Sequence, residues 1–276
     1  MTHPTRFNVC FATDDIYAIH CAVALASVLK NARSQDDYNF YILDGGISKQ
    51  NKKTISSLTD LRDCKIQFIS IDQKTFASFF LDYHFTKAVY YRILIPELID
   101  VDKVLYLDSD VIVRKDISAF FNMKIADYYM AAIEDNSPLE QIQRLNAAGL
   151  KIESGHYYNS GVLLINCDKW RKEGITKELI SCIADNKKRI LYPDQDMLNY
   201  FLQKKIKLVD RVWNFQLSPP YNSMITEKEI SSAAILHFVT GDKPWDVDSK
   251  QLHKEEYFEY FDMVKKISTD KSGLKS

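Results

Sequence analysis

The sequence has little glycine and no excess of charge of either sign. Its 276 residues include 8 glycines, and 36 basic residues balance 37 acidic ones. Dinucleotide-binding folds and P-loops need a glycine-rich turn after a strand, and neither fingerprint is present. Non-specific binding to nucleic acid needs a positive surplus, which is also absent. We therefore expect a small-molecule partner and no nucleic-acid partner.

Paired cysteines and long apolar runs are also missing, and we expect neither a signal peptide nor a membrane span. The five cysteines are scattered without the spacing of a zinc site or a disulfide framework, so we expect reduced core residues. The apolar run CAVALASVL is too short to span a bilayer, and the first residues lack the basic flank and apolar core of a secretion signal. We expect a cytoplasmic protein with at most peripheral contact with the inner membrane face.

Short β-rich runs alternate with segments of helical periodicity in the first third of the chain. We expect strands at residues 6–13, 38–44 and 65–71, and helices at residues 17–32 and 48–62. Strands that alternate with helices form βαβ units, in which parallel strands lie between helices on both faces. The fold class is therefore α/β, a single Rossmann-like domain with helices on both faces of its sheet.

The later part of the chain is less regular. A helix is expected at residues 87–99, and it leads into an apolar strand at 104–113 that two aspartates interrupt. We expect further strands at residues 129–134, 158–166, 207–210 and 233–239. Because these strands do not alternate with helices as the first ones do, we expect the central sheet to be mixed.

No linker divides the chain, so we expect one main domain at residues 1–246 and a C-terminal tail at residues 247–276 that packs on it. The tail has aromatic residues at helical spacing. An amphipathic helix that closes the core is one interpretation, and attachment to a membrane surface is the other. The mixed charges of the tail favour the first.

Two acidic pairs follow strands of the expected parallel sheet. Asp14 and Asp15 follow the first strand, and Asp108 and Asp110 follow the apolar run KVLYL. Ligands of open α/β sheets bind beyond the carboxyl ends of the strands. Two carboxylates so close together repel each other, and burying them is costly unless a cation lies between them. The triplet at residues 108–110 is therefore either a solvated turn or a clamp for Mg²⁺ or Mn²⁺ that also holds phosphate oxygens.

A second segment favours the metal clamp. His237 ends an apolar strand, and Lys243 follows in the next loop. An imidazole beside two carboxylates favours Mn²⁺ over Mg²⁺. A lysine close to the ion would suit a phosphate ligand.

Five segments resemble, in order and approximate spacing, the retaining family 8 glycosyltransferases, which include bacterial lipopolysaccharide galactosyl- and glucosyltransferases and the glycogenins. They are FATDDIYA, YLDSDVIV, YYNSGVLLINCDKWR, YPDQDMLN and HFVTGDKPW. The resemblance extends from residue 6 to about residue 246 and is strongest to the small lipooligosaccharide galactosyltransferases. It implies a GT-A type fold and a nucleotide-sugar donor.

The resemblance also implies roles for individual residues. It places Mn²⁺, with Mg²⁺ as the alternative ion, between Asp108, Asp110 and His237, where the ion bridges the diphosphate of UDP-glucose or UDP-galactose. It assigns nucleotide contacts to Ala12, Asp14, Tyr17, Asp108, Ser109 and Lys243. It assigns contacts with the donor sugar to Arg92, Asn159, Ser160, Asp194 and Gln195, and a contact with the donor or the acceptor sugar to Glu134.

Some of these residues have simpler interpretations. Tyr17 could be a core aromatic residue, Arg92 could form a salt bridge on a helix face, Asn159 could lie in a turn before a strand, and Asp194 could cap a helix. The chain also differs from the relatives at three positions. Ile16 replaces an asparagine, Glu134 replaces an aspartate, and Thr240 stands where the relatives have a glycine that here falls at 241.

Retention of configuration at the anomeric carbon has two routes. A double displacement needs a carboxylate nucleophile, for which Asp194 is a candidate. Gln195 matches the family position that faces the anomeric carbon, and an amide oxygen is a poor nucleophile. The resemblance therefore favours a front-side displacement, in which Gln195 stabilises positive charge on the sugar.

We thus expect a retaining transferase that moves galactose or glucose from a UDP-sugar to a saccharide acceptor, either free or lipid-linked. Two alternatives stay open. One is a UDP-sugar-binding protein without activity. The other is a phosphohydrolase of the haloacid-dehalogenase type, although the D-x-D motif of those enzymes follows the first strand and here it lies more than a hundred residues into the chain.

Overall fold

The computed structural model describes residues 6–33, 36–72 and 88–273. Within these residues the strands form a central sheet of seven strands and a second sheet of three. The central sheet contains β1 (Arg6–Thr13), β2 (Asp37–Asp44), β3 (Lys65–Ser70), β4 (Lys103–Leu107), β6 (Met130–Glu134), β7 (Tyr158–Asn166) and β8 (Ile206–Val209). The second contains β5 (Val111–Val113), β9 (Phe215–Leu217) and β10 (Ile235–Phe238).

The described helices are mostly short. The α-helices are α1 (Ala18–Asn31), α2 (Lys49–Ser56), α3 (Ala88–Tyr91), α4 (Ile95–Leu98), α5 (Ser118–Phe121), α6 (Pro138–Ala147), α7 (Cys167–Lys172), α8 (Ile175–Asn186), α9 (Pro193–Leu202), α10 (Glu227–Ser232) and α11 (Lys254–Gly273). The 3₁₀ helices are η1 (Ser57–Asp60), η2 (Arg92–Leu94), η3 (Gln203–Lys205), η4 (Arg211–Trp213) and η5 (Pro219–Met224).

The central sheet has the order β3-β2-β1-β4-β7-β6-β8. Strands β3, β2, β1 and β4 are parallel, and β7 runs antiparallel to both β4 and β6. The prediction of a mixed sheet is therefore confirmed. The chain builds outward from β1 to β2 and β3 and then returns to the other side of β1, so the order reverses between β1 and β4. In α/β folds such a reversal opens a crevice at the carboxyl ends of the two strands.

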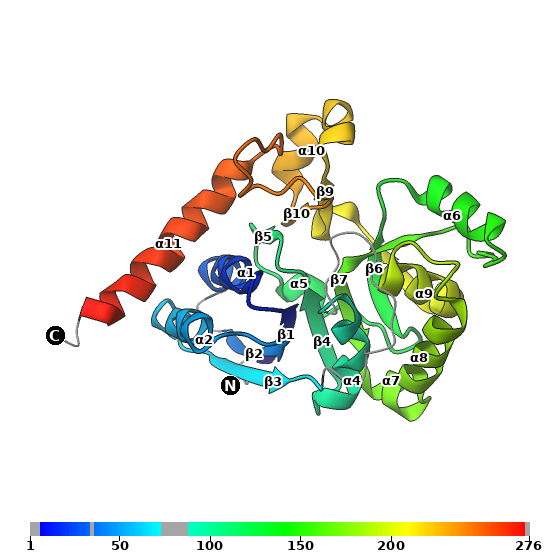
Figure 1. The fold of residues 1–276 in the computed structure, drawn as a ribbon, viewed down its shortest axis with the longest axis horizontal. Coiled ribbons are helices and arrows are strands. Elements are labelled where there is room, and N and C mark those ends of the chain that lie inside the picture. Colours follow the sequence, from blue (N-terminus) through cyan, green and yellow to red (C-terminus); the bar gives the residue numbers. More distant parts are fainter. Residues whose placement is uncertain (1–5, 34–35, 73–87, 274–276) are drawn as a thin grey trace.

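Helices cover both faces of the central sheet (Figure 1). Side chains of β1 point alternately to the two faces, and both sets are buried. Phe7, Val9 and Phe11 point to one hydrophobic cluster, which also includes residues of α1 and α11. Cys10 and Ala12 point to the other, which includes residues of α8 and α9. Successive side chains of a strand face opposite sides, so apolar residues at every position indicate a strand buried on both sides.

The apolar segment 104–113, which we expected to be one strand, is divided between the two sheets. Strand β4 ends at Leu107, and β5 begins at Val111 and pairs with β10 rather than with the central sheet. The strand expected at residues 233–239 therefore does not lie in the central sheet. The physical reason is the acidic turn, because its two carboxylates cannot continue a ladder that is buried on both faces.

The helix expected at residues 87–99 is also divided, into α3, η2 and α4, and residue 87 lies outside the described part. Pro96 has no backbone N–H and cannot donate to the carbonyl oxygen of Arg92, which accepts from Ile95 instead. This tighter turn is a 3₁₀ helix, and it places Arg92 at the junction of the pieces.

Helix α11 packs along α1, where Tyr257 and Val264 are buried (Figure 1). Among the described residues, no helix combines the length and the apolar character that crossing a bilayer requires. The domain boundary between residues 246 and 247 stays a prediction.

Thr240 has a positive φ of 81°. This left-handed conformation favours glycine and is strained for a β-branched residue. This conformation would suit the glycine that the resemblance implies for this position.

We expect Thr240→Gly to stabilise the protein. Relief of a strain of about 1–3 kcal/mol outweighs the entropy cost of a glycine, about 0.5–1 kcal/mol. A net gain of about 1 kcal/mol would raise the Tm by roughly 2–4 °C in a thermal unfolding scan. Thr240→Asn should give an intermediate Tm, because asparagine tolerates the left-handed region better than threonine. A Tm lowered by the glycine would contradict the strain.

Candidate active site

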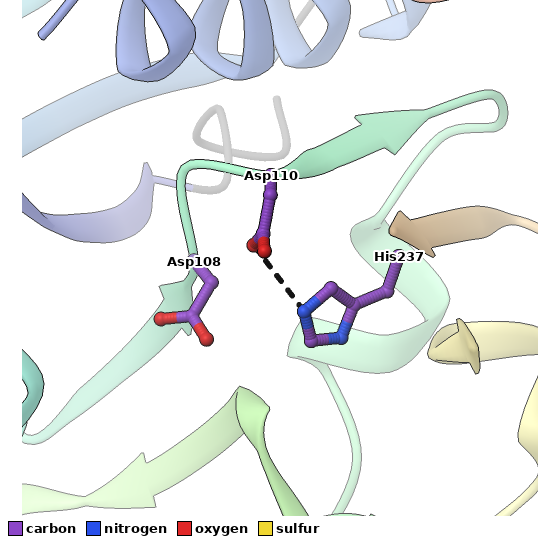
Figure 2. Close-up of side chains that lie close together, drawn as sticks. All are labelled: Asp108, Asp110 and His237. Atoms are coloured by element: carbon purple, nitrogen blue, oxygen red, sulfur yellow. Dashed lines mark ion pairs between the residues drawn. The ribbon is translucent and has the colours of Figure 1, made fainter. Parts of the chain in front are cut away.

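The two aspartates and the histidine meet where the two sheets diverge. Asp108 follows β4, Asp110 precedes β5, and His237 lies on β10, so that the three side chains converge in Figure 2. Their ligand atoms all lie within 4.8 Å of one another. The structure thus brings together the three metal ligands that the resemblance implies.

The residues fit a small divalent cation. Ions such as Mg²⁺ bind oxygen at about 2.1 Å, so opposite ligands of one ion lie about 4.2 Å apart, close to the observed span. Asn214 Oδ1 is 2.9 Å from His237 Nδ1 and leaves Nε2 directed at Asp110. An outer partner of this kind fixes the orientation of metal-binding histidines.

Lys243 neutralises Asp110. Its ammonium group lies 2.6 Å from Asp110 Oδ2 and also donates to the carbonyl oxygen of Phe238 at 2.7 Å. Burial would raise the pKa of Asp110, but Lys243 and His237 outweigh it and hold that pKa well below its usual range. Asp110 is therefore a carboxylate at neutral pH, as a metal ligand must be.

Arg92 neutralises Asp108. The guanidinium is 5% exposed and lies 3.0 Å from Asp108 Oδ1, which also accepts a hydrogen bond from the Tyr106 hydroxyl at 2.6 Å. The other edge of Arg92 lies 3.1 Å from Asp194 Oδ2. The salt bridge considered for Arg92 thus exists, but it lies inside the protein and bridges two carboxylates instead of lying on a helix face.

Asp194 does not cap a helix, so that interpretation is wrong. Helix α9 begins at Pro193 after the cap residue Tyr192, and Asp194 lies inside its first turn. The Asp194 side chain is buried, and burial raises its pKa despite the opposing charge of Arg92. An ionised carboxylate at this place depends on Arg92 for its neutralisation.

A bulge in β7 orients the next group of residues. The pairing of β6 with β7 shifts after Ala132, so that residues 160–162 have no partner on β6. A bulge of this kind redirects side chains and is common beside functional sites. Asn159 lies in this strand and accepts hydrogen bonds from Asn214 and from the backbone of Gly161, so the interpretation of Asn159 as a turn residue is wrong.

The Gln195 amide is held at both ends. Its Oε1 accepts from the Ser160 backbone N–H at 2.9 Å, and its Nε2 donates to Asp135 Oδ2 at 3.2 Å. Glu134 points elsewhere, because its carboxylate pairs with His156 at 2.8 Å. Asp135 therefore contacts Gln195, whereas the resemblance implied a role for its neighbour Glu134. The sequence analysis assigned no role to Asp135.

Gly161 is a second residue of the candidate site that was not predicted. A Cβ atom there would lie 2.2 Å from His237 Cε1 and 2.8 Å from Asp108 Oδ2. The Gly161 carbonyl oxygen also accepts from the backbone N–H of Asp108 at 2.8 Å. The segment YYNSG contains Gly161, but the sequence does not show that Gly161 lies against His237 of β10 in the folded protein.

Three of the predicted nucleotide residues lie in β1 or in the segment that joins β1 to α1. Ala12 is buried in β1, and Asp14 Oδ1 accepts from the backbone N–H of Tyr17 at 3.0 Å, which fixes the start of α1. The Tyr17 ring is partly exposed and packs edge-on against Trp245. Ser109 differs, because its buried hydroxyl group lies beside the Cys21 thiol, so only its backbone is left for a nucleotide.

Comparison with known proteins identifies the family. The model of glycosyl transferase family 8 matches residues 8–249. This chain belongs to that family. The match confirms the resemblance, and it overturns the phosphohydrolase alternative.

Individual family members agree with this assignment. General stress protein A of Bacillus subtilis is 32% identical over 94% of each chain. Lipopolysaccharide 1,3-galactosyltransferase of Salmonella typhimurium is 28% identical over 87% of this chain and 73% of its own. A crystal structure of the galactosyltransferase LgtC with donor and acceptor sugar analogues has a TM-score of 0.81 and 29% identity, over 93% of this chain and 96% of that one. The structural likeness confirms the expected fold class.

We expect Gly161→Ala to weaken divalent cation binding. The new methyl group would force His237 and Asp108 apart, and loss of ligand orientation costs roughly 10–100-fold in metal affinity. Calorimetric titration with Mn²⁺ measures the change.

Gly45→Ala is the matched control. Its Cβ would lie 3.0 Å from the Thr13 carbonyl oxygen and 3.1 Å from the Tyr91 ring, away from the three ligands. We expect this variant to lose stability but to keep its Mn²⁺ affinity. Equal Mn²⁺ affinities for both glycine variants and the unmodified protein would contradict the close-approach argument.

Proposed function

We propose that the protein is a metal-dependent retaining glycosyltransferase that transfers galactose or glucose from a UDP-sugar to a saccharide acceptor. The observation that supports it best is the cluster of Asp108, Asp110 and His237 at the point where the strand order reverses. The chain has no glycine-rich cradle for a diphosphate, so charge must hold it. We infer Mn²⁺ as the ion from the imidazole ligand, with Mg²⁺ as the alternative.

The roles of the donor-binding residues follow from their positions. Ala12, Asp14 and Tyr17 lie at the end of β1, where a uridine would extend from the metal site. Lys243 would leave Asp110 for the β-phosphate. The metal, when bound, supplies positive charge that stabilises the departing diphosphate.

The geometry favours a front-side displacement. Gln195 is fixed by Ser160 and Asp135 and presents an amide dipole, which can stabilise positive charge on the sugar without forming a bond. Asp194 has both an ion pair with Arg92 and a buried position. To attack as a nucleophile, Asp194 would have to leave its ion pair with Arg92. The buried guanidinium of Arg92 would then lack the Asp194 carboxylate as a partner.

For the acceptor we propose a saccharide, either free or lipid-linked, because the Salmonella relative acts in lipopolysaccharide synthesis according to its name. Donor and acceptor of this kind suit a cytoplasmic protein with peripheral contact with the inner membrane face.

A UDP-sugar-binding protein without activity is the second candidate. One observation favours it: Arg92 and Lys243 already neutralise the two aspartates, so the cluster is stable without an ion. Turnover of UDP-sugar separates the two candidates.

Calorimetric titration with UDP, UDP-glucose and UDP-galactose, each with Mn²⁺ and with EDTA, tests the donor site. We expect micromolar affinity with Mn²⁺ that is lost with EDTA, and a preference between the sugars identifies the donor. Activity is tested by incubating the protein with the preferred UDP-sugar and measuring the UDP that its hydrolysis releases. Absence of UDP binding under every condition would overturn the proposal.

We expect Asp110→Asn to remove metal-dependent donor binding. The change removes a ligand, so the loss of Mn²⁺ affinity should exceed the roughly 100-fold that loss of an outer partner costs. Asp248→Asn is the control, because Asp248 is exposed in the same loop as Lys243. An unchanged UDP-sugar affinity in Asp110→Asn would contradict the metal role.

We expect Lys243→Met to have opposite effects on the metal and the nucleotide. Without UDP the variant should bind Mn²⁺ about fivefold more tightly, since the ion no longer competes with an ion pair of roughly 1 kcal/mol. With Mn²⁺ present it should bind UDP about tenfold more weakly, because a charged hydrogen bond to phosphate is lost. Calorimetry measures both, and weaker Mn²⁺ binding would contradict the competition.

A further inference from the structure

The loop between β10 and α11 (residues 239–253, the β10–α11 loop) places Lys243 through a tight turn. The Asp246 backbone N–H donates to the Lys243 carbonyl oxygen at 3.0 Å, and the Asp246 carboxylate accepts from the Lys243 backbone N–H at 2.8 Å. Pro244 follows Lys243, at the turn position where its fixed φ is favourable. Trp245 is the next residue, so the position of its ring and that of Lys243 are coupled.

The Trp245 ring is stacked on His20. The two ring centroids are 3.5 Å apart with an interplanar angle of 14°. His20 lies in the first turn of α1, just after the loop that contains Asp14 and Tyr17. The stack therefore connects the proposed uridine side of the candidate site with the proposed phosphate side.

His20 is in turn held by the C-terminal helix. The Tyr257 hydroxyl group and His20 Nδ1 form a hydrogen bond of 2.7 Å, and the Tyr257 ring lies 5.2 Å from the Trp245 ring. Tyr257 is 2% exposed, so the hydrogen bond is shielded from water. Burial lowers the pKa of His20 to about 4, which leaves a neutral ring against Trp245 at neutral pH.

We propose that Tyr257 is a positioning residue for the donor site, which acts through His20 and Trp245 to keep Lys243 within reach of the nucleotide diphosphate. This inference rests on the proposed function, because it assigns α11 a role in binding the nucleotide diphosphate. Nothing in the motif HFVTGDKPW requires a tyrosine on a helix that begins several residues later. The helix thus does more than cover α1.

The chain contains a matched control on the same helix. Tyr260 lies three residues after Tyr257, and its hydroxyl group accepts a hydrogen bond from Asn31 of α1 at 2.8 Å. Tyr257→Phe and Tyr260→Phe each remove one hydroxyl group that links α11 to α1. Of the two tyrosines, Tyr257 is the one that contacts both His20 and Trp245.

The test is calorimetric titration with UDP in the presence of Mn²⁺, on the full chain. Loss of one neutral hydrogen bond corresponds to about a threefold to tenfold change, so we expect Tyr257→Phe to weaken UDP binding by that factor. Tyr260→Phe should change it less than about twofold. His20→Gln keeps a polar partner for Tyr257 but removes the ring beneath Trp245, and it should weaken UDP binding as Tyr257→Phe does.

A double-mutant cycle shows whether Tyr257 acts through Lys243. In the Lys243→Met protein the effect of Tyr257→Phe on UDP binding should fall below about twofold, because coupled residues are not additive. An undiminished effect in that background, or equal losses in Tyr257→Phe and Tyr260→Phe, would overturn this inference while the proposed function stands. Absence of UDP binding by the unmodified protein would overturn both.

Discussion

The repulsion between Asp108 and Asp110 is the constraint on which the rest of the site depends. The pair ends β4 and precedes β5, so the chain leaves the central sheet and enters the second sheet at this turn. Each carboxylate is neutralised from a different element, Asp108 by Arg92 of η2 and Asp110 by Lys243 of the β10–α11 loop. The charges of the site therefore hold together segments that lie far apart in the sequence.

The local pattern of the sequence was enough to predict the parts of the fold that depend on neighbours in the chain. Short β-rich runs that alternate with helical segments predicted β1 and the helices on both faces of the sheet. The acidic triplet after an apolar run left a solvated turn and a metal clamp open, and the structure shows the two aspartates beside His237. Which sheet a short strand joins was not predictable in this way. The four residues of β10 have an apolar pattern that suits either sheet, and pairing with β5 decides the matter. That pairing depends on the turn at 108–110.

Contacts between segments that are far apart in the sequence explain other differences between the predicted site and the structure. Gly161 is required because β7 passes within contact distance of His237, and no local pattern shows such an approach. The resemblance implied Glu134 as a sugar contact, whereas the following residue, Asp135, reaches Gln195. Glu134 is the last residue of β6 and pairs with His156, whereas Asp135 lies just beyond the strand, so the two neighbouring carboxylates have different partners. Thr240 has a positive φ although it is not a glycine, and no local pattern in the sequence indicates this conformation.

The balance of charge in the cleft gives a physical reason to expect that nucleotide binding depends on the metal. Three carboxylates, those of Asp108, Asp110 and Asp194, face the two cations Arg92 and Lys243, so the cluster has one negative charge more than it has positive charges. A diphosphate would be repelled by this cluster at close range. A divalent ion bound by Asp108, Asp110 and His237 would reverse the sign of the cluster, and Lys243, once released from Asp110, would be available to phosphate. The metal and the diphosphate should consequently bind with positive cooperativity, because each removes an unfavourable charge that the other would meet.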